Sequence, residues 1–284
     1  MADPEQFNAD QLAFWNGPGG GIWVERQAHT DVILEPVSEA LRTLAAPRAG
    51  ERVLDIGCGC GASTLDFARA VGPAGHVVAL DISGPMLAEG RARARDAGIT
   101  NIEWQQADAA TAVLDEFDLL VSNFGLMFFG DPVAAFANLR AAAKPKARMA
   151  FVCWGGLTEN PWMEVPMQAV SFHFPPRPPA NPDAPGMFAF ADPARVSQIL
   201  TAAGWAMPRL EKLDVNLDIA ARRGLTEAVV QLTKIGAINS WLRDQPAKTV
   251  SAAIRSLREA LAAHVDGSSV RLRGSVWLVS SSPA

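Results

Sequence analysis

The chain has 284 residues, of which 49% are hydrophobic and 19% are charged, and its formal net charge at pH 7 is −5. This length and apolar content suffice to bury a sizeable core, which excludes a disordered chain and indicates one large domain or one domain with a small cap. The acidic balance and the lack of a dense Lys/Arg cluster argue against a phosphate backbone as ligand, so we expect no nucleic-acid partner.

The sequence also argues against a membrane protein and against a metal-binding protein. The longest nearly apolar run, residues 119–129, contains polar residues and glycine, and it is shorter than the roughly 20 residues that a spanning helix needs. The first residues lack the basic and apolar parts of a signal peptide. Three cysteines and four scattered histidines show neither a disulfide framework nor zinc-ligand spacing. We therefore expect a soluble cytoplasmic protein with no metal.

The N-terminal part, residues 1–48, is predicted to be a helical lid. Its glycine cluster at residues 17–21 is flanked by Trp15 and Trp23. Because glycine adopts backbone conformations that other residues avoid, we expect this cluster to form a turn or a mobile loop. A helix is predicted over residues 23–46.

Between residues 49 and 155, short apolar runs alternate with helical segments. The predicted strands are 52–56, 76–82, 101–106, 117–122 and 147–154, and the predicted helices between them are 62–70, 85–97 and 132–143. Ser83 is a candidate N-cap for the second of these helices. Such alternation is typical of a parallel sheet with helices on both faces.

The remaining residues divide into a loop and a second half of the sheet. Residues 156–192 are rich in proline and are predicted to form a lid or substrate loop with a short helix at 163–172. Residues 193–284 are predicted to complete the sheet and to carry a helical cap inserted at about 222–266. The elements expected there are a helix at 194–203, a strand at 209–217, helices at 225–241 and 252–265, and a final strand at 270–279.

The strongest local signal lies where the first strand ends. Gly57, Gly59 and Gly61 alternate before a helix begins, so the main chain there can approach a ligand without intervening side chains. The free N–H groups and positive dipole end of that helix favour a carboxylate or a phosphate. Asp55 lies at the end of the strand. Asp81 closes the second strand, 20 residues after the last glycine, where its carboxylate can accept from both ribose hydroxyls.

The segment Asp55-Ile-Gly-Cys-Gly-Cys-Gly61 resembles the D/E-x-G-x-G-x-G signature of class I S-adenosylmethionine (SAM)-dependent methyltransferases. Further segments are similar to the same family in order and spacing, namely Asp81-Ile82 with Met86, Ala107-Asp108-Ala109, and the run from Phe117 to Phe124. Residues 139–151 resemble the family's approach to its fifth strand, but Lys146-Ala147 replaces a glycine pair, so we expect that turn to be built differently. The resemblance covers about residues 50–155 and lies closest to ubiquinone/menaquinone-type and related small-molecule methyltransferases.

This resemblance implies a Rossmann-like α/β fold with a seven-stranded, mostly parallel sheet, with SAM as cofactor and S-adenosylhomocysteine (SAH) as product. It implies that Gly57, Cys58 and Gly59 line the methionine part of SAM. It also implies that Ser122 or Asn123 presents a backbone carbonyl to the methionyl ammonium.

For the adenosine part, the resemblance implies that Asp81 holds the ribose, with Ile82 and Met86 beside the adenine. It places Asp108 at the adenine amino group and the N–H of Ala109 near the ring. Purely structural roles stay open for several of these side chains. The acid at the end of the first strand can bond loop amides instead of ligand, Asp108 can cap a helix, Met86 can fill the core, and the loop cysteines can simply be small residues that fit.

The segment after the fourth strand narrows the acceptor. The run Ser122-Asn-Phe-Gly-Leu-Met-Phe-Phe129 lacks the N-P-P-Y or D-P-P-Y type of motif found in enzymes that methylate nucleobase or glutamine amino groups. Because ligands of open α/β sheets bind at the carboxyl ends of the strands, we expect an apolar acceptor pocket there. Its predicted residues are Trp15, Trp23, Phe124, Met127, Phe128, Trp154 and Trp162. The acceptor is then a small, apolar or flat molecule, methylated at O, N, S or C by in-line displacement.

A general base is needed only when the acceptor is a poorly ionised hydroxyl or a carbon acid. His173, in the proline-rich loop, is the first candidate and His29 is the second. Two alternative functions remain at this level. Gly57-x-Gly59-x-x-Ala62 also fits the fingerprint of an NAD(P)-dependent oxidoreductase, and the chain can equally be a SAM-binding module without catalysis. We expect a monomer or a homodimer that acts on a small-molecule substrate.

Overall fold

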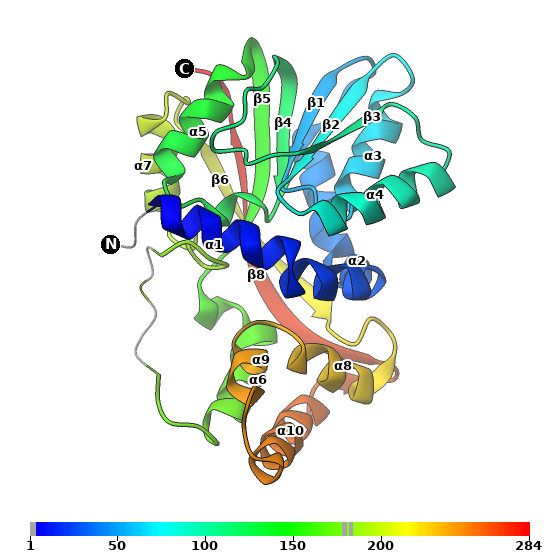
Figure 1. The fold of residues 1–284 in the computed structure, drawn as a ribbon, viewed down its shortest axis with the longest axis vertical. Coiled ribbons are helices and arrows are strands. Elements are labelled where there is room, and N and C mark those ends of the chain that lie inside the picture. The colour runs from blue at the N-terminus through cyan, green and yellow to red at the C-terminus, as the bar shows by residue number, and fades with distance from the viewer. Residues whose placement is uncertain (1–3, 178–180, 182–183) are drawn as a thin grey trace.

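The computed structural model describes residues 4–177, 181 and 184–284. This part of the chain folds around one sheet of eight strands. The strands are β1 (Arg52–Ile56), β2 (His76–Asp81), β3 (Ile102–Gln106), β4 (Phe117–Asn123), β5 (Ala143–Trp154), β6 (Arg209–Asp218), β7 (Val265–Asp266) and β8 (Ser269–Ser281). Their order is β3-β2-β1-β4-β5-β8-β6, with the short β7 attached to β8 (Figure 1). The first five strands pair in parallel, and β8 runs antiparallel to β5 and to β6. The prediction of a mostly parallel, Rossmann-like sheet is confirmed, with β7 as an addition.

Ten α-helices surround this sheet in the described part of the chain. They are α1 (Pro4–Asn16), α2 (Pro18–Ala45), α3 (Ala62–Val71), α4 (Gly84–Asp96), α5 (Pro132–Ala141), α6 (Pro161–Ser171), α7 (Pro193–Ala202), α8 (Gly224–Thr233), α9 (Gly236–Leu242) and α10 (Ala247–Ala262). Two short 3₁₀ helices, Leu126–Phe128 and Leu157–Glu159, follow β4 and β5. Within the described residues, no helix has both the length and the apolar character to cross a membrane.

The helices form layers that follow from the sequence pattern. β1, β2 and β4 are nearly continuous buried apolar runs, as expected for parallel strands that are covered on both faces. α2 packs on the sheet beside α3 and α4, while α5 packs with α7. α1 crosses the carboxyl edge of the sheet, and α6, α8, α9 and α10 form a cap beyond it (Figure 1). The molecule therefore has a carboxyl edge enclosed between one crossing helix and one cap.

The glycine cluster at residues 17–21 is not the turn or mobile loop that we expected. Only its first residue lies between helices, because α1 ends just before it and α2 begins just after it. A Cβ atom on Gly20 would lie 2.1 Å from the carbonyl oxygen of Trp15, and a Cβ atom on Gly19 would lie 2.3 Å from the ring of Phe14. Glycine is thus required here for the close approach of the two helices rather than for flexibility.

Two further predictions were wrong in extent. The single helix expected at 225–241 is divided into α8 and α9, because Gly236 has a φ of +54°, which a continuous right-handed helix excludes. At residues 143–147 there is no turn before the fifth strand. β5 already begins at Ala143, and its pairing with β4 shifts register between Phe117 and Leu119. The Lys146-Ala147 stretch is therefore an irregularity inside the strand.

The N-cap predicted for the helix after β2 is confirmed. The Ser83 hydroxyl accepts from the backbone N–H of Met86 at 3.4 Å. The same hydroxyl donates to the carbonyl of Trp15 at 2.7 Å. The cap of α4 therefore also ties the carboxyl end of β2 to the end of α1.

Candidate functional site

The loop between β1 and α3 takes the left-handed conformation at each of its three glycines. The φ angles of Gly57, Gly59 and Gly61 are +65°, +56° and +80°. A Cβ atom on Gly57 would lie 2.7 Å from the Cα of Gly125, and one on Gly61 would lie 2.5 Å from the ring of Trp104. A side chain is therefore excluded at Gly57 and at Gly61 for two reasons, because neighbouring protein atoms would clash with it and because the φ angles are positive.

The middle glycine has a different kind of neighbour. A Cβ atom on Gly59 would come within 3.0 Å of the methyl group of Met86 and 4.0 Å of Nε1 of Trp23, which are both ends of side chains. Its N–H donates to Oδ2 of Asp81 at 2.8 Å, while Oδ1 of Asp81 accepts from the N–H of Ser83 at the same distance. Burial raises the pKa of Asp81. Each of its carboxylate oxygens keeps acceptor capacity for a ligand hydroxyl.

Asp55 lies fully buried under the glycine loop. Its Oδ2 accepts from the hydroxyls of Ser63 at 2.9 Å and Thr64 at 2.6 Å, both at the beginning of α3. Its Oδ1 is buried and has no hydrogen-bond partner in the described part of the chain. Burial raises the pKa of Asp55 to about 6, and Asp81 acts in the same direction, while the two hydroxyls lower it. An unpaired carboxylate oxygen here fits the cationic amino group of an amino-acid ligand.

The residues that the resemblance assigns to adenine lie under α1. Oδ2 of Asp108 accepts from Asn8 Nδ2 at 3.3 Å, and its Oδ1 accepts a backbone N–H two residues later. Asn16 donates to the carbonyl of Ile82 at 2.9 Å and accepts from the N–H of Gly84 at 3.0 Å. The carboxyl ends of β2 and β3 are therefore held by side chains of α1.

Four of the predicted cofactor residues have side chains committed to the protein. The side chain of Cys58 is buried beside α4, and Ala109 lies in the main core. The hydroxyl of Ser122 donates to the last carbonyl of β1 at 2.7 Å, and the amide of Asn123 donates to Ser38 on α2 at 3.0 Å. These positions still offer a ligand their main chain, and Asn123 also offers its Oδ1, which is buried without a partner among the described residues.

The predicted apolar pocket separates into two aromatic groups and Met127, and three of its residues belong to the buried core. Phe124 stacks on Trp154 with ring centroids 4.4 Å apart and planes at 15°, and Trp154 packs against Trp162 at 4.9 Å. Phe124 has a φ of +67°, an uncommon value for a bulky residue. Met127, Trp154 and Trp162 are 2%, 4% and 8% exposed and belong to the buried core, whereas Phe124 is half-buried. The first aromatic group therefore forms a wall from the end of β4 through β5 to the start of α6.

The second aromatic group comes from the helices over the sheet edge. Trp15 at the end of α1 meets Trp23 of α2 at 6.0 Å and Phe128 at 6.1 Å, in both cases edge to face. Since Trp23 also approaches Gly59, this group lies directly over the glycine loop.

The two histidines that were predicted as bases lie in different environments. His29, on α2, is 3% exposed, and its Nε2 is 3.1 Å from the carbonyl of Ile219. Because a carbonyl only accepts, Nε2 carries the proton and Nδ1 presents its lone pair. That Nδ1 is buried without a partner among the described residues. Burial and the charge of Arg26 lower the pKa of His29, so the imidazole is neutral at pH 7.

His173 follows the end of α6 that lies away from β5. Its Nε2 is 2.9 Å from the hydroxyl of Ser256 on α10. The structure therefore places this first candidate within the cap, whereas His29 lies beside the carboxyl end of β6.

Several residues at the site carried no sequence signal. Arg93 on α4 donates to the carbonyl of Cys60 in the glycine loop at 2.8 Å and to Asp31 on α2 at 2.6 Å. Arg26 on α2 donates to Gln231 on α8, and Oγ1 of Thr30 on α2 is buried without a partner among the described residues. These residues belong to no motif. Arg26 and Arg93 were missed because their partners lie more than 30 positions away in the chain, and Thr30 was missed because the burial of its hydroxyl depends on distant segments.

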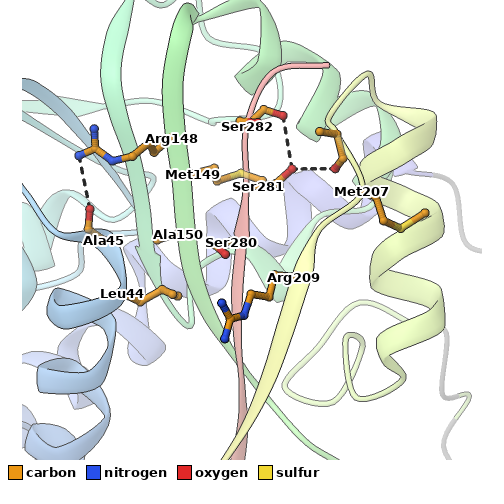
Figure 2. A pocket seen from close by; sticks show the side chains of 11 residues that line it. Leu44, Ala45, Arg148, Met149, Ala150, Met207, Arg209, Ser280, Ser281 and Ser282 are labelled. Atoms are coloured by element: carbon orange, nitrogen blue, oxygen red, sulfur yellow. Dashed lines mark hydrogen bonds between the residues drawn. The ribbon is translucent and has the colours of Figure 1, made fainter.

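Figure 2 shows a separate hollow of about 350 Å³ at the other end of the sheet. It is lined by the end of α2, the first half of β5, the start of β6 and the end of β8, with Arg148 and Arg209 as its charged side chains. Ligands of α/β sheets bind outside the carboxyl ends of the parallel strands. We therefore place the functional site at the glycine loop and not in this hollow.

Sheet order, glycine loop and the acids on β1 and β2 together define a Rossmann-like methyltransferase domain. A family model described as "Methyltransferase domain" matches residues 53–146. Residues 53–146 therefore carry a methyltransferase domain, and the chain is similar in sequence to UbiE-type C-methyltransferases. The expected resemblance is confirmed, and the match favours SAM over a nicotinamide dinucleotide.

Among its relatives, the ubiquinone/menaquinone biosynthesis C-methyltransferase UbiE of Vibrio vulnificus is 36% identical over 133 residues, which cover 46% of this chain and 51% of that protein. Nocamycin O-methyltransferase of Saccharothrix syringae is 28% identical over 246 residues, which cover 82% of this chain and 85% of that one. The solved YcgJ protein of Bacillus subtilis has a similar fold, with a TM-score of 0.57, 18% identity, and coverage of 87% of this chain and 97% of that one. The matched segment spans about half the length of the UbiE-type relatives.

Proposed function

We propose that this protein transfers the methyl group of SAM to a small organic acceptor and releases SAH. The observation that carries the proposal is the main chain at Gly59, which is bordered by side-chain ends and lies between the buried acids Asp55 and Asp81. SAM supplies a methyl group that is already activated on a sulfonium. The protein's task is then to position, to exclude water and to handle a proton.

The cofactor would be held by three acids in different ways. Asp81 has acceptor capacity left for the ribose hydroxyls while it keeps the loop amide of Gly59 in place. The unpaired Oδ1 of Asp55 suits the methionyl ammonium. Asp108 would exchange its long 3.3 Å contact with Asn8 for the adenine amino group.

We propose that α1 and the first turns of α2 act as a lid over this site. Asn16 and the carbonyl of Trp15 bond to the segment that follows β2. The indole of Trp23 lies over the glycine loop. Release of the few hydrogen bonds made by α1 would open the site, and their return would exclude water from the sulfonium.

We assign the role of general base to His29 rather than to His173. The unpaired Nδ1 of His29 is neutral and would accept the proton of an acceptor O–H or C–H as the new bond to the methyl carbon forms. The S–CH₃ bond breaks with its electron pair left on sulfur. The ring would remain oriented by its bond to the carbonyl of Ile219.

The acceptor is proposed to be a small molecule that contacts the wall of Phe124, Trp154 and Trp162. The names of the relatives record methylation at carbon and at oxygen, and both need a proton acceptor when the nucleophile is not yet ionised.

The test is calorimetry followed by turnover. We expect purified protein to release or absorb heat with SAM and with SAH, and to give none with NADH. A panel of phenols, quinols and carboxylic acids is then incubated with SAM, and SAH is measured. No heat with either SAM or SAH contradicts the proposal. Binding of SAM without SAH formation from any acceptor would favour the SAM-binding module without catalysis.

A further inference from the structure

Arg26 on α2 is a buried cation that forms no ion pair in the described part of the chain, although the carboxylates of Glu25 and Glu227 act on it from a longer distance. Its side chain is 5% exposed, and its one hydrogen bond runs from Nε to the neutral amide oxygen of Gln231 on α8, at 2.6 Å. Among the described residues, no carboxylate lies within ion-pair distance of the guanidinium, and its two terminal nitrogens, which keep some contact with solvent, make no hydrogen bond to protein. Desolvation lowers the pKa of Arg26 to about 10, so the group keeps its charge at pH 7.

Arg26 belongs to a polar face of α2. Arg26, His29 and Thr30 are spaced i, i+3 and i+4, which places them on one side of the helix. Nδ1 of His29 and Oγ1 of Thr30 are both buried without a partner in the described part of the chain. Three neighbouring side chains therefore offer two sets of donors and one acceptor that the protein itself does not use.

This face lies at the carboxyl edge of the sheet. Trp23, which approaches the glycine loop at Gly59, precedes Arg26 by three residues on the same helix. On the other side, Ile219 follows the end of β6, and Gln231 belongs to the cap. The polar face therefore lies between the proposed methyl donor and the cap.

The unpaired groups are unfavourable for the isolated protein. Buried charges in proteins are normally paired, and an unsatisfied buried polar group destabilises the fold by about 1–3 kcal/mol, more when it is charged. A trapped water molecule could satisfy the hydroxyl of Thr30, but it would not neutralise the guanidinium of Arg26. The chemistry that satisfies the whole set is a ligand with a negatively charged oxygen.

We propose that Arg26, assisted by Thr30, binds an oxyanion of the acceptor beside the atom that is methylated, and that the methyl acceptor therefore carries a carboxylate or an ionised phenol or enol. This inference rests on the proposed methyltransferase function. It assigns Arg26 to recognition of the acceptor's charge. A buried guanidinium should favour an anionic acceptor strongly over its neutral analogue, because the neutral analogue leaves the guanidinium unpaired.

In the test, small probe molecules are titrated into SAH-loaded full-length protein at pH 8, and their binding is measured by calorimetry. One arm compares benzoate with neutral benzamide, and the other compares 4-nitrophenolate with neutral 4-nitroanisole. We expect at least one anion to bind about tenfold or more tightly than its neutral partner. Arg26→Gln, which retains an amide donor for Gln231, should remove this preference, and Arg26→Lys should restore part of it. The arm that shows the preference identifies the carboxylate or the phenolate class.

Arg255→Gln, at an exposed position on α10, is the matched control and should keep the preference. The melting temperature of Arg26→Gln should not fall below that of the wild type, because the variant removes a buried charge that has no ion-pair partner. Equal binding of anions and neutral partners, or a preference that survives Arg26→Gln, overturns the proposal. SAH binding is scored separately. Its absence would contradict the methyltransferase function, whereas intact SAH binding without any anion preference would contradict only the role of Arg26.

Discussion

The glycine loop and the polar face of α2 lie at the same edge of the sheet, yet their polar groups differ. At the glycine loop, Asp81 accepts two backbone N–H groups, and Asp108 accepts one backbone N–H and one side-chain amide. On α2, Arg26 makes one hydrogen bond, to a neutral partner, and Nδ1 of His29 makes none within the described residues.

The difference indicates how each region is prepared for its ligand. The groups beside the loop hold their own main chain in place and need little rearrangement when the cofactor arrives. The groups on α2 are left unsatisfied, so the free protein is less stable there and the missing partner is strongly favoured. Changes near the loop should therefore reduce cofactor affinity, whereas changes on α2 should affect the acceptor and the proton.

The largest effect is expected at His29. His29→Gln keeps a donor for the carbonyl of Ile219 but removes the base, so kcat should fall about 10²- to 10⁴-fold while SAH affinity stays unchanged. Initial rates of SAH formation with an acceptor from the panel measure this. His173→Gln, in the cap, should keep wild-type kcat. A larger loss in that variant would reverse our assignment of the base.

The pH dependence of activity is a second test of His29 as the general base. Burial, Arg26 and Arg223 lower the pKa of His29, whereas the Ile219 carbonyl and Glu227 raise it. Activity should therefore rise with pH on an acid limb that lies below the usual value of about 6.5, since only the neutral ring accepts a proton. In Arg26→Gln one cationic neighbour is gone, and the limb should move to higher pH. An unmoved limb would mean that another group titrates.

A somewhat smaller effect is expected at the cofactor. Asp81→Ala removes the acceptor of the Gly59 amide and the partner proposed for the ribose, so the SAH dissociation constant should rise about 100-fold, or by about 3 kcal/mol. Titration calorimetry measures the change. Asp96→Ala, at the exposed end of α4, is the control. Unchanged SAH affinity in Asp81→Ala would refute the proposed position of the cofactor.

Asp55 offers a test of stability rather than of affinity. Its folded-state pKa is about 6 against an ordinary value of 3.8. Because the folded-state value is raised, ionisation destabilises the fold as the pH rises from about 4 to 6. At about 1.4 kcal/mol per pKa unit, the loss reaches up to about 3 kcal/mol. Asp55→Asn should therefore stabilise the cofactor-free protein at pH 8 and lose this advantage near pH 4, as urea unfolding will show. A gain that does not vary with pH would contradict this explanation.

The smallest effect is expected at the start of α2. Gly20→Ala puts a methyl group against the carbonyl of Trp15 and should destabilise the protein by about 1–3 kcal/mol. Gly21→Ala is the matched control, since no atom lies within 4 Å of the added Cβ, and helix propensity should then stabilise it by up to about 1 kcal/mol. Thermal unfolding of the two variants measures both changes in stability. Equal effects would mean that α1 and α2 do not pack closely.

The parts that were predicted correctly are those whose partners lie close in the chain. The positions of Gly57, Gly59 and Asp81 at the ends of β1 and β2 were predicted because a strand, a tight turn and a helix follow one another within about 30 residues, while their roles toward the cofactor stay predictions. Ser83 was recognised as a cap because its partner is three residues away. The alternation of apolar runs likewise predicted the parallel half of the sheet.

The glycine cluster at residues 17–21 shows where local rules fail. Composition suggested flexibility, but the neighbours of Gly20 show that the missing side chain serves close packing. Arg26 forms a hydrogen bond with Gln231, 205 positions away in the chain, and the ring of His29 lies within hydrogen-bond distance of the carbonyl of Ile219, 190 positions away. Periodicity and spacing describe only the chain near each residue.

Local sequence thus specified the strands, the caps and the glycine loop that is proposed to hold the cofactor, since hydrogen bonds over a few residues and burial of alternating apolar runs require nothing distant. Only the folded chain decided which polar side chains of α2 are buried, and which of them are unpaired. Burial and desolvation depend on what packs against a helix, and here that is the end of β6 and a cap encoded about 200 residues later.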